Sequence, residues 1–273
     1  MSKDLIIKNI EPFDLALTLD CGQAFRWSAT DDGGFEGIAM GRYLKIRQTD
    51  GNLIFYDTSE EDYNNIWKDY FDFDRDYNEI LSKARKNQLL LKITQNCGGI
   101  RLLKQEPWEA LCSFIISQNN NIPRIKGIIE RLCENFGDKI ENGYTFPSAQ
   151  KLSTLTVEDL APLRSGFRAK YILSAANKCS SEIDLNSLTS LPIDKAREIL
   201  MTITGVGPKV ADCTLLFGLG FQSAFPMDVW MKRAMAALFD NRLPDGLEDC
   251  AGIIQQYIFH YARTEKITFD DNK

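Results

Sequence analysis

The N-terminal part of the chain alternates apolar and polar residues, which is typical of β-strands. Within residues 1–57, the stretch "YLKIRQTDGNLIFYD" (43–57) alternates on both sides of Asp50-Gly51. An Asp-Gly pair between two alternating runs is a strong signal for a two-residue hairpin turn. Because successive strand residues point to opposite faces, residues 1–57 predict an antiparallel sheet with one buried face.

From about Ser59 the apolar positions follow helical spacing. Thr58 or Ser59, followed by Glu61 and Asp62, predicts a capped helix start, and Pro107 stands at a favourable first-turn position of "PWEALCSFIISQ". The stretch "IPRIKGIIERLCENFG" has the same spacing and ends on a glycine. Further helices are predicted near residues 156–164, 168–178, 193–202, 207–218 and 246–262.

The two patterns predict an α+β fold in which an N-terminal antiparallel β-sheet domain packs on a helical domain. We place the first domain, with its connecting helices, at residues 1–105 and the helical domain at 106–273. The length of 273 residues and an apolar content of 44% suffice for two modest cores. No apolar run approaches 18 residues and no leader pattern opens the chain. We therefore expect a monomeric cytoplasmic protein, associated with the nucleoid in a prokaryote, without a membrane partner.

Cysteine and charge patterns narrow the chemistry. The seven cysteines are scattered without a C-x-x-C pair and there is one histidine, His260, so we expect no metal and no cofactor. Scattered, reduced thiols fit the cytoplasm. The net charge of −6 argues mildly against nucleic acid as a partner. Residues 60–79 carry eight acids and two bases, whereas 161–178 carry four bases and no acid. Solvated helix faces explain the acidic run, and they are one of two equally weighted explanations of the basic run.

The stretch "ITGVGPKVADC" (203–213) predicts two helices joined by a tight turn. Gly205 and Gly207 permit positive φ and a close approach to the backbone. The free N–H groups at the start of the second helix form an anion site that can hold a DNA phosphate without many lysines. The −6 charge is then no obstacle, although an ordinary helix corner explains the motif equally well.

Lys209 and Asp228 add a chemical hypothesis. The start of a helix disfavours an ammonium, which favours the neutral, nucleophilic form of the Lys209 amine. Asp228, in "FPMDVW", stands just before another helical pattern. Taken separately, Lys209 is an ordinary surface lysine and Asp228 an N-cap. Together they provide the amine and carboxylate of a Schiff-base site.

Several separate motifs extend this hypothesis, and in order they resemble the helix-hairpin-helix 8-oxoguanine DNA glycosylases. They run from about Asp20 to His260: "CGQAFRW" (21–27), "SQNNNIPRI" (117–125), "GFRAKY" (166–171), "GVGPKVADC" (205–213), "PMDV" (226–229) and "AGIIQQYIF" (251–259). The fold of that family, a small antiparallel β domain on a helical domain, agrees with the pattern above.

The resemblance implies a bifunctional enzyme that extrudes the damaged base from the duplex. Lys209 matches the nucleophile that attacks C1′, expels the base and forms a Schiff base, from which β-elimination cleaves the strand. Asp228 matches the carboxylate that stabilises the positive charge developing on the sugar. Four further positions match base-binding residues: the Gly22 carbonyl faces N7, Gln255 reads the Watson–Crick edge, and Phe259 and Cys213 contact the two faces of the base. Without the resemblance, Gly22 is a turn residue, and Phe259 and Cys213 belong to the core.

The resemblance also implies a DNA-binding set. Asn119 fills the vacated gap, Arg124 and Arg168 hold the unpaired cytosine, and Phe167 is the wedge where a tyrosine is common. The remaining implied contacts are Gly205, Gly207, Val210, Val229 and Trp230. Trp230 replaces a histidine that contacts phosphate in the family, and His260 receives no role.

Three functions stay open from the sequence. The first is an 8-oxoguanine glycosylase and abasic-site lyase acting on double-stranded DNA, with the lesion opposite cytosine. The second is a glycosylase for another lesion such as an alkylated base, against which Lys209 argues. The third is a non-catalytic DNA-binding module, against which the joint presence of Lys209 and Asp228 argues. The C-terminal cysteine cluster of the iron–sulfur relatives is absent, since only Cys250 follows Cys213.

Overall fold

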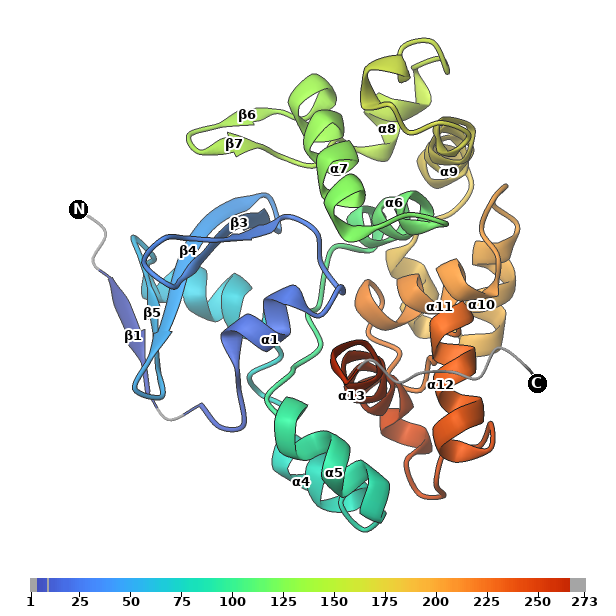
Figure 1. Ribbon diagram of the computed structural model, residues 1–273. Helices are drawn as coiled ribbons and strands as arrows, with labels where there is room; N and C mark the ends of the chain where they lie inside the picture. Colours follow the sequence, from blue (N-terminus) through green and yellow to red (C-terminus); the bar gives the residue numbers. More distant parts are fainter. Residues whose placement is uncertain (1–3, 9, 266–273) are drawn as a thin grey trace.

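A five-stranded antiparallel sheet forms the N-terminal part of the computed structural model, which describes residues 4–8 and 10–265 (Figure 1). The strand order is β1-β5-β4-β3-β2. Asp50 and Gly51 have φ angles of 49° and 74°, which suits a tight hairpin turn and confirms the predicted β4–β5 connection. The strands are β1 (Leu5–Ile7), β2 (Trp27–Ala29), β3 (Phe35–Ala39), β4 (Arg42–Thr49) and β5 (Asn52–Phe55).

Residues 1–57 are not all strand, because helix α1 spans Leu15–Asp20. Asp14 caps this helix by accepting a hydrogen bond from the Leu17 N–H at 2.8 Å. Leu15 and Leu19, four residues apart, are both 2% exposed. The prediction of strands alone is therefore wrong here, since a short capped helix buries the apolar positions instead.

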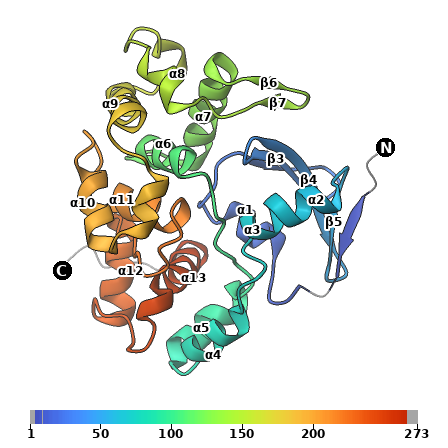
Figure 2. The ribbon, with the colours of Figure 1, turned by 180° about the vertical axis from the view of Figure 1, so that it is seen from behind.

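The segment that begins at Ser59 is helical, as predicted. Ser59 caps α2 (Glu60–Asp62) by accepting from the Asp62 N–H at 3.0 Å. The helix continues through a π-helical turn at Tyr63–Trp67 and α3 (Lys68–Tyr70). Figure 2 shows α2 and α3 lying across the sheet, and Tyr63, Trp67 and Tyr70 of this helical segment share a buried core with the strands.

The rest of the chain is almost entirely helical (Figure 1). The helices are α4 (Tyr77–Ala84), α5 (Gln88–Cys97), α6 (Pro107–Ser117), α7 (Ile122–Phe136), α8 (Ala149–Ser153), α9 (Arg168–Ser181), α10 (Ile193–Met201), α11 (Pro208–Phe217), α12 (Val229–Phe239) and α13 (Ala251–Thr264). A small hairpin of β6 (Lys139–Ile140) and β7 (Gly143–Tyr144) follows α7.

Two predicted helices differ from the structure. Between residues 156 and 164 only a 3-10 turn forms, at Ala161–Leu163. Pro162 has no N–H to continue a helix, and Arg164 adopts a left-handed conformation with φ of 52°. The last helix begins at Ala251 rather than 246, after a 3-10 turn at Glu248–Cys250.

Two hydrophobic cores organise the molecule. The smaller one lies between the sheet and α1–α3, and the larger one includes α4, α5 and all later long helices. The predicted domain boundary between residues 105 and 106 stays a prediction. The outer ends of the two predicted domains, residues 1–3 and 266–273, lie outside the described residues. Helices α4 and α5 precede this boundary but pack in the larger core.

Buried Gln23 anchors the α1–β2 loop to the segment between α5 and α6. Its amide donates to the Thr18 and Arg101 carbonyls at 2.9 and 2.8 Å, and its side-chain oxygen accepts from the Leu103 N–H at 2.9 Å. The Gln105 amide donates to the Gln23 carbonyl at 2.7 Å. This network fixes the loop between α1 and β2, and so seats Gly22 against the helical part.

Candidate active site

One small pocket collects all six residues predicted for catalysis and base binding. Its cavity volume is about 60 Å³. Helices α11 and α13 supply three residues each, and the others come from the α1–β2 loop, α6 and the segment before α12. The lining residues are Gly22, Phe114, Lys209, Cys213, Phe217, Pro226, Asp228, Gln255, Gln256 and Phe259.

The α10–α11 hairpin forms as predicted, but its two glycines differ. Gly205 has φ of 85°, and a Cβ there would come within 2.2 Å of the Tyr171 ring, so this position requires glycine. Gly207 has φ of −96°, against the expectation of positive φ, and a Cβ there would meet nothing within 4 Å. Open space at Gly207 and a helix start that no described side chain caps fit a phosphate-binding turn.

The Lys209 amine is held at the pocket wall by α6. Its Nζ donates to the Ser117 Oγ at 3.0 Å and lies 5.1 Å from the centroid of the Phe114 ring. Ser117 in turn donates to the Phe114 carbonyl at 2.8 Å. Ser117 had no predicted role, although it opens the motif "SQNNNIPRI".

Asp228 is the predicted N-cap and also lines the pocket. It is the N-cap of α12 and accepts a hydrogen bond from the Met231 N–H at 2.7 Å. A carboxylate at a helix N-terminus is stabilised by the helix dipole. The same side chain lines the pocket with Lys209, so its carboxyl group and the amine border one cavity.

Cys213 and the aromatic residues make one wall apolar. Burial raises the pKa of the Cys213 thiol to about 11, against a lowering by the Lys209 charge, so the thiol is neutral at pH 7. The Phe114 and Phe217 rings stack with centroids 5.2 Å apart. Such a wall suits the flat face of an aromatic base.

Gly22 and Phe259 meet at the other side of the pocket. Gly22 has φ of 87°, and a Cβ there would lie 3.9 Å from Phe259 Cε1 and 3.4 Å from Arg263 Nη1. The Arg263 guanidinium lies 5.6 Å from the Phe259 ring centroid. Arg263 was not among the predicted site residues, although it stands four residues after Phe259 on the same helix face.

Several predicted DNA contacts lie on the surface. Asn119 is exposed in the α6–α7 turn with φ of 48°, and Arg124 is exposed in the first turn of α7. Phe167, Val229 and Trp230 are 50%, 67% and 47% exposed. Val210 is only 2% exposed, and its contact with DNA stays a prediction.

Arg168 differs from its predicted neighbours because it is 3% exposed. Its Nε donates to the Gln118 carbonyl at 3.0 Å, Nη1 to the Ser165 carbonyl at 3.2 Å, and Nη2 to the Gln118 and Asn119 carbonyls, the latter at 3.0 Å. Its donors therefore bind backbone around Asn119 in this structure, and its contact with cytosine stays a prediction.

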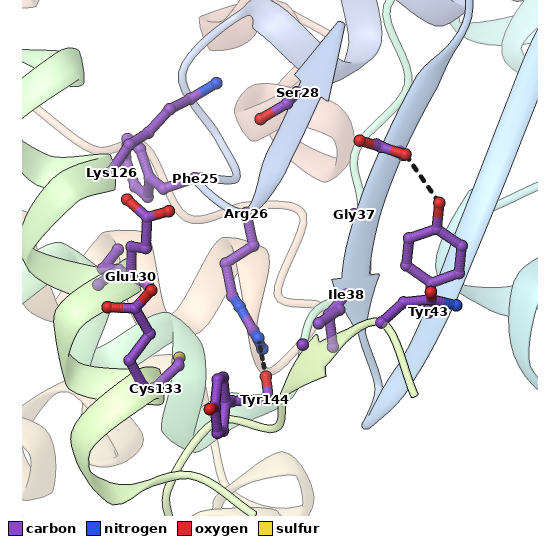
Figure 3. Close-up of a pocket in the computed structure, with 15 residues that line it drawn as sticks. Phe25, Arg26, Ser28, Gly37, Ile38, Tyr43, Lys126, Glu130, Cys133 and Tyr144 are labelled. Carbon is purple, nitrogen blue, oxygen red and sulfur yellow. Dashed lines mark hydrogen bonds between the residues drawn. The ribbon is translucent and has the colours of Figure 1, made fainter. Parts of the chain in front are cut away.

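A larger cleft of about 380 Å³ lies elsewhere, between β2, β3, α7 and the β6–β7 hairpin (Figure 3). Arg26 donates to the Tyr144 carbonyl at its base, and the Tyr43 hydroxyl donates to Glu36 at 2.7 Å. It contains no predicted site residue. Within residues 4–8 and 10–265, no His, Cys, Asp and Glu group could hold a metal ion, and no helix is long and apolar enough to cross a membrane.

Known proteins match the chain over nearly its whole length. A family model for the N-terminal domain of 8-oxoguanine DNA glycosylase matches residues 5–111, and one for HhH-GPD superfamily base excision DNA repair proteins matches 112–244. A crystal structure of the Clostridium acetobutylicum 8-oxoguanine glycosylase/lyase, in complex with double-stranded DNA containing cytosine opposite 8-oxoguanine, has a TM-score of 0.92 and 38% identity. The match covers 98% of this chain and 97% of that one.

Two eukaryotic relatives carry the name N-glycosylase/DNA lyase. Those of Saccharomyces cerevisiae and Arabidopsis thaliana are 34% and 31% identical over 80% and 79% of this chain. The matches cover 66% and 64% of those proteins, just under two thirds of their length. The two consecutive family matches and the assembled pocket lead to one conclusion: this chain belongs to the 8-oxoguanine DNA glycosylases of the HhH-GPD superfamily.

Proposed function

We propose that this protein is a bifunctional repair enzyme that flips 8-oxoguanine out of duplex DNA, excises it through a lysine Schiff base and then cleaves the strand as a lyase. The main support is the pocket that places Lys209 and Asp228 beside Gly22, Gln255 and Phe259. The clostridial relative, bound to DNA with cytosine opposite the lesion, supports the same substrate for this chain.

The lesion is recognised through a single proton. 8-Oxoguanine carries a hydrogen on N7, where guanine has a lone pair, so a carbonyl facing N7 attracts one base and repels the other. Gly22 suits this role because its loop is fixed by Gln23 and its backbone faces Phe259 and Arg263 without an intervening side chain. With guanine in the pocket, the Gly22 carbonyl would face a lone pair and lose its hydrogen bond. This loss distinguishes guanine from 8-oxoguanine.

The pocket must open before a purine enters. A cavity of about 60 Å³ holds only a few waters. Phe259 is partly exposed at the edge of the larger core and lies beside Arg263, so we expect its movement to admit the base.

The chemistry follows from the two groups at the floor. The neutral Lys209 amine attacks C1′, the C1′–N9 bond breaks, and the base departs with the electron pair. Asp228 stabilises the positive charge on the sugar, and the attacking nitrogen loses a proton to the departing base. The C1′–O4′ bond then opens, O4′ takes up a proton, and the protonated Schiff base forms. Abstraction of a C2′ proton then expels the 3′ phosphate.

Borohydride trapping tests this function. With a duplex carrying 8-oxoguanine opposite cytosine, the wild type should form a covalent adduct and release the base. Lys209→Gln should bind the duplex and lose both trapping and excision, and Asp228→Asn should slow single-turnover excision by at least about 100-fold. An adduct with Lys209→Gln, or near-normal rates with Asp228→Asn, would contradict the assignment. Duplexes with an alkylated base or uracil separate this function from that of other glycosylases.

A further inference from the structure

Gln256 is a buried pocket residue that lies in the motif "AGIIQQYIF" but has no role in the predicted site or in the catalytic scheme. It follows Gln255 on α13, is 4% exposed and lines the same pocket. Its amide Nε2 donates to the Gln255 Oε1 at 3.0 Å. The two neighbouring glutamines therefore form one hydrogen-bonded pair beneath the space that a base would occupy.

A backbone carbonyl dictates which way both amides point. The Gln255 Nε2 donates to the Pro226 carbonyl at 3.3 Å, and a carbonyl can only accept. Gln255 must therefore turn its NH₂ group toward Pro226 and its oxygen toward Gln256. That oxygen needs a donor, so Gln256 must in turn present its own NH₂ group.

This arrangement leaves one atom of Gln256 without a partner. Its Oε1 is buried and receives no hydrogen bond from any described residue. A buried acceptor without a donor costs free energy, whereas an apolar side chain of similar size would avoid this cost. The glutamine is thus a poor choice for stability alone, and its value lies in the hydrogen bond to Gln255.

We propose that Gln256 is a positioning residue that, together with the Pro226 carbonyl, holds the amide of Gln255 in the orientation that reads guanine. The Watson–Crick edge of guanine offers the O6 acceptor beside the N1–H donor, so it needs a donor and an acceptor in a set order. Rotation of the Gln255 amide by 180° would exchange the two and favour an adenine-type edge. This inference rests on the proposed function, because it concerns the same base pocket.

The test uses Gln256→Met, which keeps the size of the side chain and removes the donor. Single-turnover excision of 8-oxoguanine opposite cytosine should fall about tenfold. Borohydride trapping on an abasic site, which presents no base to read, should stay at the wild-type level. The midpoint of thermal unfolding should not fall, since a buried unpaired oxygen is lost. A purely structural residue would instead lower that midpoint and affect both substrates.

A double variant and a matched control complete the test. If Gln256 acts through Gln255, then Gln255→Met with Gln256→Met should excise no more slowly than Gln255→Met alone. Tyr257→Phe is the control, because the Tyr257 hydroxyl is also buried without a partner among the described residues but lies outside the pocket. It should leave excision unchanged.

The outcomes separate the two proposals. Normal excision by Gln256→Met, additive losses in the double variant, or an equal loss on the abasic site would overturn the positioning role. If the wild type neither excises 8-oxoguanine nor forms an adduct at an abasic site, the proposed function itself fails.

Discussion

At the scale of single residues, the resting contacts of Lys209 define what its reaction requires. The Ser117 hydroxyl accepts a hydrogen bond from the Lys209 amine at 3.0 Å, and the same hydroxyl donates to the Phe114 carbonyl. Ser117 can therefore only accept from the amine, and it holds Nζ on the α6 side of the pocket. The position of the nucleophile thus depends on a residue 92 positions away in the sequence.

We expect Ser117→Ala to slow single-turnover excision by about 10- to 100-fold, because small displacements of a reacting group have large effects on rate. The affinity for a lesion duplex should change little, since Ser117 does not line the pocket. Ser117→Thr keeps the hydroxyl and should retain most of the rate. Equal rates for the alanine variant and the wild type would show that Lys209 finds its position without this contact.

At the scale of elements, Arg168 of α9 clamps the α6–α7 turn. Its guanidinium donates to the carbonyls of Gln118 and Asn119, and so it supports the left-handed conformation of Asn119. It also lies 4.5 Å from the centroid of the Phe167 ring. Arg124, by contrast, is exposed on the first turn of α7. The two arginines predicted as a pair therefore stand in different environments.

This difference predicts different effects of removing each arginine. Arg124→Ala should reduce the preference for cytosine opposite the lesion, because its exposed guanidinium is available to the O2 and N3 acceptors of that base. Arg168→Ala should slow excision opposite all four bases to a similar degree, because it loosens the turn that carries Asn119. Single-turnover rates on four duplexes measure both effects. A selective loss opposite cytosine in Arg168→Ala would show that this side chain leaves the backbone to read the base.

Helices whose apolar pattern repeats over several turns were predictable from the sequence, whereas short elements were not. Helices α9, α10 and α11 begin within one residue of the predicted positions because an apolar stripe and flanking Gly or Pro mark them. Helix α1 was missed because its six residues contain too few helical turns for its apolar pattern to be distinguished from the alternation of a strand. The 3-10 turn at Ala161–Leu163 depends on Pro162, whose missing N–H outweighs the favourable spacing around it.

At the scale of the whole molecule, the pocket is assembled from segments that only the fold brings together. Local spacing could pair Lys209 with Cys213 and Gln255 with Phe259, since each pair lies four residues apart on one helix. Spacing could not place Gly22 beside Phe259, because that contact depends on the buried Gln23 network between the two cores. The family motifs supplied those associations, but Ser117, Gln256 and Arg263 became apparent only from side-chain contacts.

A buried ion pair also bridges the two parts of the molecule. Arg26, just before β2, lies 3.4 Å from the Glu109 carboxylate of α6, and the side chains are 9% and 12% exposed. Burial raises the pKa of Glu109 to about 7, although the Arg26 charge lowers it. The loss of solvation therefore outweighs the attraction at this distance.

The raised pKa predicts how stability depends on pH. In the unfolded chain Glu109 titrates near pH 4.3, so between that value and about 7 the folded state binds the extra proton. The stabilisation that protonated Glu109 gives the folded state is complete at acidic pH and is lost as the pH rises through about 7. We expect the free energy of unfolding, measured by urea titration at several pH values, to carry a declining component from pH 5 to pH 7. Glu109→Gln, which cannot ionise, should remove that component, and an unchanged pH profile in this variant would assign the decline to other groups.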